Sequence, residues 1–181
     1  WYNTIHPSAM IATRTAKTCF VYGTLMSKEV LHCLLGRIPR MQPKVILQNH
    51  SRHPVRQHVY PGVIPSTSTS ASVEGALLFD LSPLDLKLLD YFEEEGVDYK
   101  RTDVQIQIPD VSSLDEDIQT LVTNSSNKDD NLSSSSRILK TQAYIWLKGT
   151  AALDTTKDWD FEEFRRDRLD WYLQFTVKPC R

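Results

Sequence analysis

The chain has 181 residues, 40% of them hydrophobic and 24% charged, with a formal net charge of −2 at pH 7 and a pI near 6.2. This size and composition are those of one globular domain with a buried core. The charge argues against nucleic acid or an anionic membrane as the main partner, and no apolar run approaches membrane-spanning length. The three cysteines form no CxxC pair, so we expect a reducing, cytoplasmic environment.

The first predicted elements are a strand over residues 18–22 and a short helix over residues 27–36. Ser27 is a suitable N-cap for this helix and Gly36 a suitable C-terminal stop. The segment between the two elements breaks at Gly23, and glycine permits backbone conformations that are closed to other residues. Because the break precedes a helix N-terminus, it predicts either a backbone cradle for an anion or a plain strand-to-helix turn.

The middle of the chain predicts further strands. Residues 44–64 indicate strands separated by a polar loop, and Pro61 and Gly62 near their end are a turn signal. Another strand is predicted over residues 73–80, in which Gly75 indicates a β-bulge or a close approach of two backbones.

Three histidines, His50, His53 and His58, are close enough in sequence to be considered as metal ligands. They have no cysteine or acidic ligand nearby, and Pro54 lies among them. We expect a polar surface loop here, and neither a metal nor a cofactor.

The helix predicted from residue 82 to residue 94 or 95 places a carboxylate at the edge of its apolar face. A proline in its first turn and a glycine beyond its end mark its limits. On a helical wheel Glu93 lies between two leucines, whereas Asp90 and Glu94 belong to the polar arc. The apolar arc is formed by Leu84, Leu88, Leu89, Tyr91 and Phe92.

A carboxylate at an apolar edge loses hydration, which raises its pKa. A group that titrates near neutrality can both accept and donate a proton, as general acid/base chemistry requires. The wheel leaves a second interpretation open, in which Glu93 pairs with a cation such as Arg101 and has a structural role only.

A long polar segment over residues 109–138 is rich in Ser, Asp and Asn. We predict a flexible, acidic and Ser-rich insertion that connects a strand over 104–108 with a strand over 141–147 as a hairpin. Too little chain follows for a second core, so we expect a single domain over residues 18–175, preceded by an extension over residues 1–17.

The C-terminal part predicts an amphipathic helix over residues 159–172. Phe161, Phe164 and Trp171 recur at helical spacing, with Leu169 and Tyr172 nearby. We expect this helix to dock on the sheet.

Several short motifs occur in an order that resembles the γ-glutamylcyclotransferase-like family, in particular its plant avirulence-induced-gene branch and the γ-glutamylamine cyclotransferases. They are residues 20–25 (FVYGTL), 60–62 (YPG), 73–75 (VEG), 89–93 (LDYFE), 99–101 (YKR), 143–146 (AYIW) and 159–165 (WDFEEFR). The resemblance implies an α+β fold with a mixed barrel-like β-sheet and packed helices. It also implies that no metal or cofactor is needed.

The resemblance implies a specific site as well. Its acid/base glutamate corresponds to Glu93, the residue that the helical wheel also selects. Its loop, which binds the α-amino acid end of a γ-glutamyl group, corresponds to Tyr22, Gly23, Thr24, Leu25, Met26 and Ser27. We therefore expect Glu93 to face the bend at Gly23 across a pocket that accommodates a glutamyl group. The chain departs from the family pattern in its acidic residues 94–98 and in the length of its insertion.

The activity that this resemblance implies is that of a γ-glutamylcyclotransferase acting on a small γ-glutamyl compound. The α-amine of the substrate attacks its own γ-amide, and 5-oxoproline and an amine or amino acid leave. Two alternatives stay open: a non-catalytic small-molecule-binding or stress-response module on the same fold, and a related lyase or acyl-transfer reaction. The sequence does not indicate the leaving group or the oligomeric state.

Overall fold

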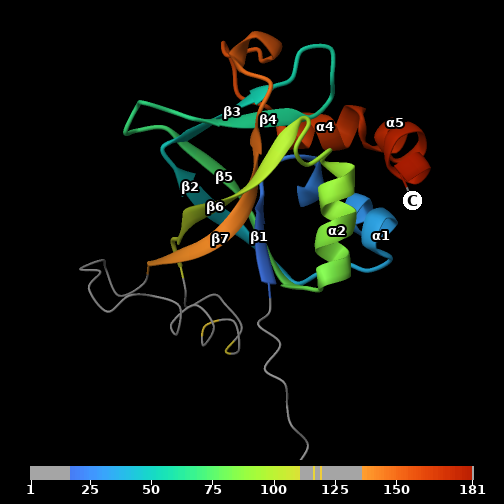
Figure 1. The fold of residues 1–181 in the computed structure, drawn as a ribbon, viewed down its shortest axis with the longest axis horizontal. Coiled ribbons are helices and arrows are strands. Elements are labelled where there is room, and N and C mark those ends of the chain that lie inside the picture. The colour runs from blue at the N-terminus through green and yellow to red at the C-terminus, as the bar shows by residue number, and fades with distance from the viewer. Residues whose placement is uncertain (1–16, 111–115, 117–118, 120–135, 181) are drawn as a thin grey trace, which may run out of the picture.

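Five strands form a closed barrel in the computed structural model, which describes residues 17–110, 116, 119 and 136–180 (Figure 1). Their order around the barrel is β1-β5-β2-β6-β7, with one parallel contact, between β1 and β7. The strands are β1 (Lys17–Val21), β2 (Met41–Gln48), β5 (Ser72–Leu81), β6 (Tyr99–Ile108) and β7 (Arg137–Trp146). The expected mixed barrel-like sheet is confirmed.

A separate two-stranded sheet, β3 (His50–Pro54) with β4 (Pro61–Pro65), adjoins the barrel. The predicted turn at Pro61 and Gly62 is wrong, because both residues begin β4, where Gly62 lies opposite His53. The chain reverses earlier instead, around Gln57, whose φ is 66°. A proline is compatible with the first position of a strand, since no ladder donor is needed there. The polar loop expected at His50 and His53 is therefore a strand.

The predicted hairpin of β6 and β7 is confirmed, and it is longer than expected. The two strands pair antiparallel from Tyr99 opposite Trp146 to Ile108 opposite Arg137. Most of the predicted flexible insertion over 109–138 lies outside the described residues, and its last two residues belong to β7.

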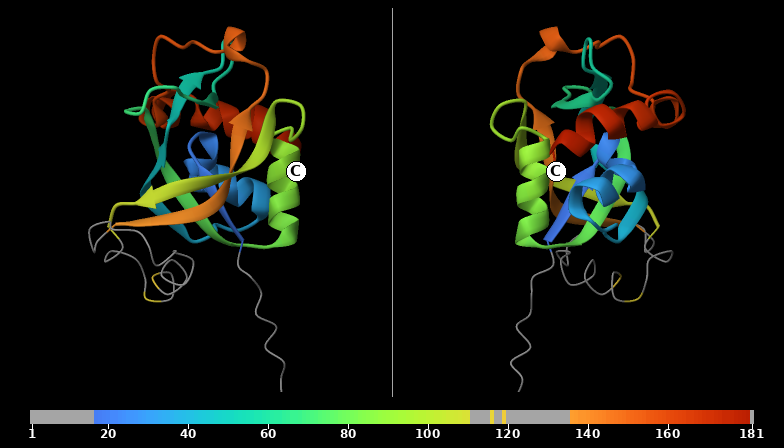
Figure 2. Two further views of the ribbon diagram at one scale, coloured as in Figure 1. Left: turned by 60° about the vertical axis from the view of Figure 1, so that its left-hand side comes forward. Right: turned by 90° about the vertical axis from the view of Figure 1, so that its right-hand side faces the viewer.

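The helices lie on one side of the barrel, as Figure 1 and the right-hand view of Figure 2 show. They are α1 (Lys28–Leu35), α2 (Pro83–Phe92), α4 (Phe161–Asp167) and α5 (Leu169–Tyr172), and a π-helix (Leu173–Val177) continues α5. The predicted cap of α1 is confirmed, since the Ser27 hydroxyl accepts a hydrogen bond from Val30 N and Gly36 adopts a left-handed φ of 70°. A capping box of Ser82 and Asp85 begins α2.

The C-terminal helix differs from the prediction because it is interrupted. Arg168, with φ −130°, separates α4 from α5, so the apolar face turns between them. Trp171 is consequently 52% exposed, whereas Tyr172 is 3% exposed. Simple helical spacing across the break had placed Trp171 on the docked face.

The core has two parts. One lies inside the barrel and includes Phe20, Leu77 and Ile106, and the other lies between the barrel and the helices. From α2, Leu86 and Leu89 belong to the part of the core between the barrel and the helices. Leu84 and Tyr91 of the predicted apolar arc are exposed. Because apolar residues extend around much of α2, their pattern alone does not determine which side of the helix packs against the barrel.

Candidate active site

A small cavity lies where the end of β1 meets the C-terminal end of α2 and the start of β4. It is lined by Phe20, Val21, Tyr22, Gly23, Thr24, Leu25, Tyr60, Pro61, Glu93 and Tyr144. The structure therefore brings Glu93 and the Gly23 bend together. The cavity volume is about 20 Å³, room for about one water molecule. The expectation of a pocket that accommodates a glutamyl group is wrong for this conformation.

Glu93 reaches this cavity because α2 ends here. Its backbone N–H is the last to join the helix, with an N···O distance of 2.9 Å to Leu89. The chain then leaves the helix through Glu94 (φ 48°) and Gly96 (φ 85°). The helix thus ends at Phe92, slightly earlier than predicted, and Glu93 is its C-cap residue.

The Glu93 carboxylate has no hydrogen bond or ion pair with another residue in the described ranges. The residue is partly buried, and desolvation raises the pKa of its carboxyl group to about 8. A carboxyl group with this pKa exchanges its proton near neutral pH, as a general acid/base must.

The raised pKa of Glu93 predicts a pH-dependent stability. The folded-state pKa of about 8 lies above the ordinary value of 4.5, so folding favours the protonated form. This contribution is fully present below pH 4.5 and is lost as the pH rises through 8. As the pH rises between these values, we expect the free energy of unfolding of wild type to fall by up to about 3 kcal/mol relative to that of Glu93→Gln. This figure allows for the partial exposure of Glu93.

Urea unfolding at a series of pH values measures this difference. Glu94→Gln, which removes the exposed neighbouring carboxylate, serves as the control and should keep the wild-type pH dependence. Parallel curves for wild type and Glu93→Gln would contradict a desolvated Glu93.

Arg101, the cation that the sequence offered as a partner for Glu93, binds Asp90 instead. Its Nε and Nη2 atoms donate to the two Asp90 carboxylate oxygens at 2.7 and 3.0 Å. Asp90 also accepts a hydrogen bond from Tyr144 Oη at 2.8 Å, and Arg101 donates to Gln142 Oε1 as well. Asp90 was predicted on the polar arc, yet it lies in this network because the Arg101 side chain reaches it from β6. Glu93 is left without the cation.

The loop after β1 contributes four of its six predicted residues to the cavity. Tyr22, Gly23, Thr24 and Leu25 line it, whereas Met26 and Ser27 do not. The Met26 N–H is bonded to Gly23 O at 3.0 Å within a 3-10 turn (Thr24–Met26). The Ser27 hydroxyl is committed to capping α1.

Two backbone donors of this loop remain available. Thr24 and Leu25 open the 3-10 turn, where an amide N–H has no intrahelical acceptor, and no acceptor among the described residues takes either one. Gly23 positions them with φ −125° and ψ −138°. Its φ is negative, so a left-handed backbone is not the reason for glycine. A Cβ atom here would lie 2.9 Å from Pro61 Cγ, and this close approach is the reason.

Five tyrosines surround Glu93. Of these, the sequence predicted Tyr22 as a substrate-binding residue, and Tyr60, Tyr99 and Tyr144 stand in motifs that carry the family resemblance. The five are Tyr22, Tyr60, Tyr99, Tyr144 and Tyr172, and burial, with a further contribution from Glu93, raises the pKa of each hydroxyl. Their hydroxyls are therefore protonated and neutral at pH 7. Four of them have protein partners. Tyr22 and Tyr99 donate to the carbonyl oxygens of Tyr144 and Pro61, Tyr144 donates to Asp90, and Tyr172 lies 3.4 Å from Thr24 Oγ1.

The family motif at residues 143–146 includes Tyr144, but the sequence did not indicate that Tyr144 or Tyr172 lies beside Glu93. Tyr144 depends on the register of β7, and Tyr172 depends on the helix break at Arg168. The tyrosine rings give Glu93 an environment that is poor in water.

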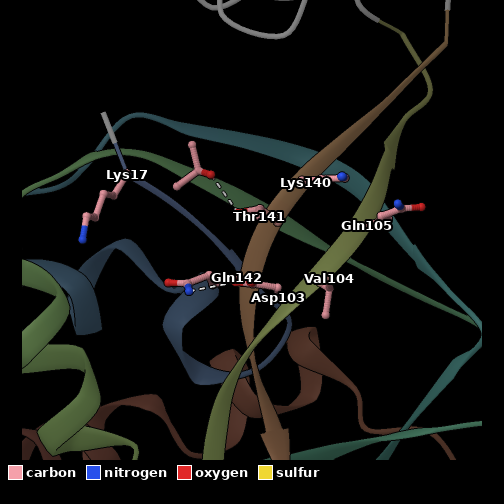
Figure 3. Close-up of a pocket in the computed structure, with 8 residues that line it drawn as sticks. Lys17, Asp103, Val104, Gln105, Lys140, Thr141 and Gln142 are labelled. Atoms are coloured by element: carbon pink, nitrogen blue, oxygen red, sulfur yellow. Dashed lines mark hydrogen bonds between the residues drawn. The ribbon is translucent and has the colours of Figure 1, made fainter. Parts of the chain in front are cut away.

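A larger cavity lies elsewhere, along β1, β6 and β7, with a volume of about 680 Å³ (Figure 3). It contains neither Glu93 nor the loop after β1. Within the described ranges, His, Cys, Asp and Glu side chains form no group of three suited to a metal ion, and no helix is long and apolar enough to cross a membrane.

Comparison with known proteins shows the family of this chain. Residues 19–161 match the model of the family described as "Gamma-glutamyl cyclotransferase, AIG2-like". The chain belongs to this family. An AIG2-like protein D from Arabidopsis thaliana is 32% identical over 167 residues, which cover 92% of this chain and 91% of the relative.

Solved structures share the fold. A solution structure of an Arabidopsis thaliana protein superimposes with a TM-score of 0.56 and 21% identity, covering 90% of this chain and 89% of that one. A yeast crystal structure described as a γ-glutamyl cyclotransferase specific to glutathione has a TM-score of 0.50 and 13% identity, covering 78% and 73%. At these identities the likeness concerns the fold alone.

Proposed function

We propose that this family member is an active γ-glutamylcyclotransferase that releases 5-oxoproline from a small γ-glutamyl compound, with Glu93 as general acid/base. One observation carries the proposal. The Glu93 carboxyl group lies in a water-poor cavity, without a cation, beside the loop with two available backbone donors. Membership of the AIG2-like family supports the same reaction.

The reaction needs only the substrate and this cavity. The Glu93 carboxylate removes a proton from the substrate α-ammonium group, and the amine then attacks the γ-carbonyl carbon to form the C–N bond of a five-membered ring. The γ-amide C–N bond breaks as Glu93 returns the proton to the departing nitrogen. Of the three protons of the α-ammonium group, the first passes through Glu93, the second is lost to water and the third stays on the ring nitrogen. The released amine takes up a proton from water.

The loop after β1 supplies the electrostatic part of the proposal. The free N–H groups of Thr24 and Leu25 hold either the substrate α-carboxylate or the oxyanion that develops on the γ-carbonyl oxygen. Holding the amine against its own γ-carbonyl group makes the attack intramolecular, which supplies several kcal/mol of the rate enhancement.

Substrate entry requires the cavity to widen, because a γ-glutamyl group exceeds its volume. Tyr60 is the lining residue best placed to move. It is partly exposed, it stacks on His58 with a centroid distance of 4.8 Å, and its hydroxyl has no hydrogen bond within the described ranges.

A panel of γ-glutamyl compounds, comprising glutathione, γ-glutamyl amino acids and γ-glutamyl-ε-lysine, tests the function. Products are identified by mass spectrometry while binding is measured in parallel. Release of 5-oxoproline together with the free amine supports the proposal. Binding without turnover would instead support a non-catalytic module, and a different product would support another lyase or acyl-transfer reaction.

Gly23→Ala is expected to weaken substrate binding. The added Cβ would press on the Pro61 ring across the cavity wall, and a loss of about 1.4 kcal/mol in binding raises KM tenfold. Steady-state kinetics with the substrate that the panel identifies measures this. Gly36→Ala, at the far end of α1, is the matched control and should leave KM unchanged. The same KM in both variants would argue against a role for the bend at Gly23.

A further inference from the structure

We infer that Asp90 is a positioning residue for the proposed reaction: by holding Arg101 it keeps a cation from pairing with Glu93, one helical turn further along α2. The inference rests on the proposed role of Glu93 as acid/base. Asp90 itself does not line the cavity.

The two carboxylates compete for one cation by geometry. Asp90 and Glu93 are three residues apart on α2, a spacing that places their Cβ atoms about 5–6 Å apart. Arg101 approaches from the neighbouring strand β6 and binds Asp90 through two nitrogens. A two-point arginine–carboxylate pair is among the stronger polar contacts in proteins. The hydroxyl of Tyr144 adds a third donor to Asp90.

Arg101 and Glu93 both act on one buried group of β1. Burial, Glu93 and Asp90 raise the pKa of the Cys19 thiol, and Arg101 lowers it. Released from Asp90, the long Arg101 side chain has Glu93 as the next carboxylate on the helix. An arginine beside a carboxyl group lowers the pKa of that group by about 1–3. Such a contact would move the pKa of Glu93 down, toward the ordinary value of a carboxyl group.

The other groups that face Glu93 do not replace Arg101 in this role. They are Cys19 from β1, Tyr22 from the loop after β1, Tyr60 from the connection before β4, Tyr99 from β6, Tyr144 from β7, Tyr172 from α5, and the neighbouring acid Glu94. None of them is a cation. Arg52 lies near the loop, but it binds both oxygens of Asp158 at 2.9 Å and the carbonyl oxygen of Tyr22 at 2.8 Å.

Asp103 offers a matched control carboxylate in the same network. It accepts a hydrogen bond from Gln142 Nε2 at 2.9 Å (Figure 3). Gln142 Oε1 in turn accepts a hydrogen bond from Arg101. Removing the charge of Asp103 changes the outer part of the network and leaves the contact of Arg101 with Asp90 in place.

The test titrates the Glu93 carboxyl group by ¹³C NMR of glutamate-labelled protein, with its signal assigned by its loss in Glu93→Gln. In Asp90→Asn we expect the pKa of Glu93 to fall by about 1–3 as Arg101 turns to it. In Asp90→Asn combined with Arg101→Met it should return to the wild-type value. Asp103→Asn should match wild type.

The double variant separates recapture of Arg101 from a direct effect of the Asp90 charge. A pKa that stays low without Arg101 would overturn the inference, as would an unchanged pKa in Asp90→Asn. If Asp90→Asn does not fold, Asp90→Ser takes its place, since it also removes the carboxylate that binds Arg101 and should lower the pKa of Glu93 in the same way. Because the readout is a titration, absence of 5-oxoproline from wild type would defeat the proposed function without altering these results.

Discussion

Glu93→Gln is expected to lower kcat for 5-oxoproline release by about 10²–10⁴-fold, the range typical of a lost general acid/base. The amide is similar in size to the carboxyl group but cannot accept a proton from the substrate ammonium group. Since the buried carboxyl group has no protein partner in the described ranges, its replacement leaves no cation unpaired. We therefore expect the variant to fold as wild type does and to bind substrate with little change.

Two neighbouring acids provide the controls for this experiment. Glu94 and Glu95 follow Glu93 directly and are exposed, so Glu94→Gln and Glu95→Gln should retain wild-type kcat. Near-normal turnover by Glu93→Gln, measured on folded protein, would exclude Glu93 as the acid/base.

Gly75→Ala is expected to lower the free energy of unfolding by about 3 kcal/mol or more, at the upper end of the effects of overpacking. Gly75, on β5, lies against β1, and an added Cβ atom would lie 2.3 Å from Val21 O and 2.7 Å from the Phe20 ring. The first contact is with backbone, so the two strands must separate. The close backbone approach expected from the sequence is confirmed here. Urea denaturation at pH 7 measures the effect.

Gly96→Ala is the comparison for this stability prediction. Its φ of 85° disfavours alanine, but nothing lies within 4 Å of an added Cβ, so only the backbone effect of about 1 kcal/mol is expected. Similar losses of stability in the two variants would show that steric contact between β1 and β5 is not the cause.

Elements with local signals were predictable from the sequence. Ser27 and Gly36 set the limits of α1 because a cap hydroxyl and a left-handed glycine act within a few residues. Ser82, with the proline after it, marked the start of α2 for the same kind of reason. The alternation in β6 was visible only in its second half, so the strand begins earlier than predicted, at Tyr99.

Features that depend on distant parts of the chain were not predictable in this way. Pro61 has the local composition of a turn, yet pairing with β3 makes it the first residue of a strand. Asp90 belongs to the polar arc of an isolated helix, and only the position of Arg101 on β6 gives it a partner. The break at Arg168, which brings Tyr172 rather than Trp171 into the core, has no comparable local signal.

For the candidate site, the sequence identified the residues better than their surroundings. Glu93 followed both from the helical wheel and from the resemblance to the family, but the wheel left a structural pairing with Arg101 equally open. The contact of Arg101 with Asp90 decides against that pairing. The size of the cavity depends on side chains from four separate segments and had no signature in the sequence.

Titration of the Glu93 carboxyl group in wild-type protein, followed by ¹³C NMR, tests the desolvated acid/base most directly. The structure predicts a midpoint near pH 8. A midpoint near 4.5, the ordinary value for a hydrated glutamate, would contradict it.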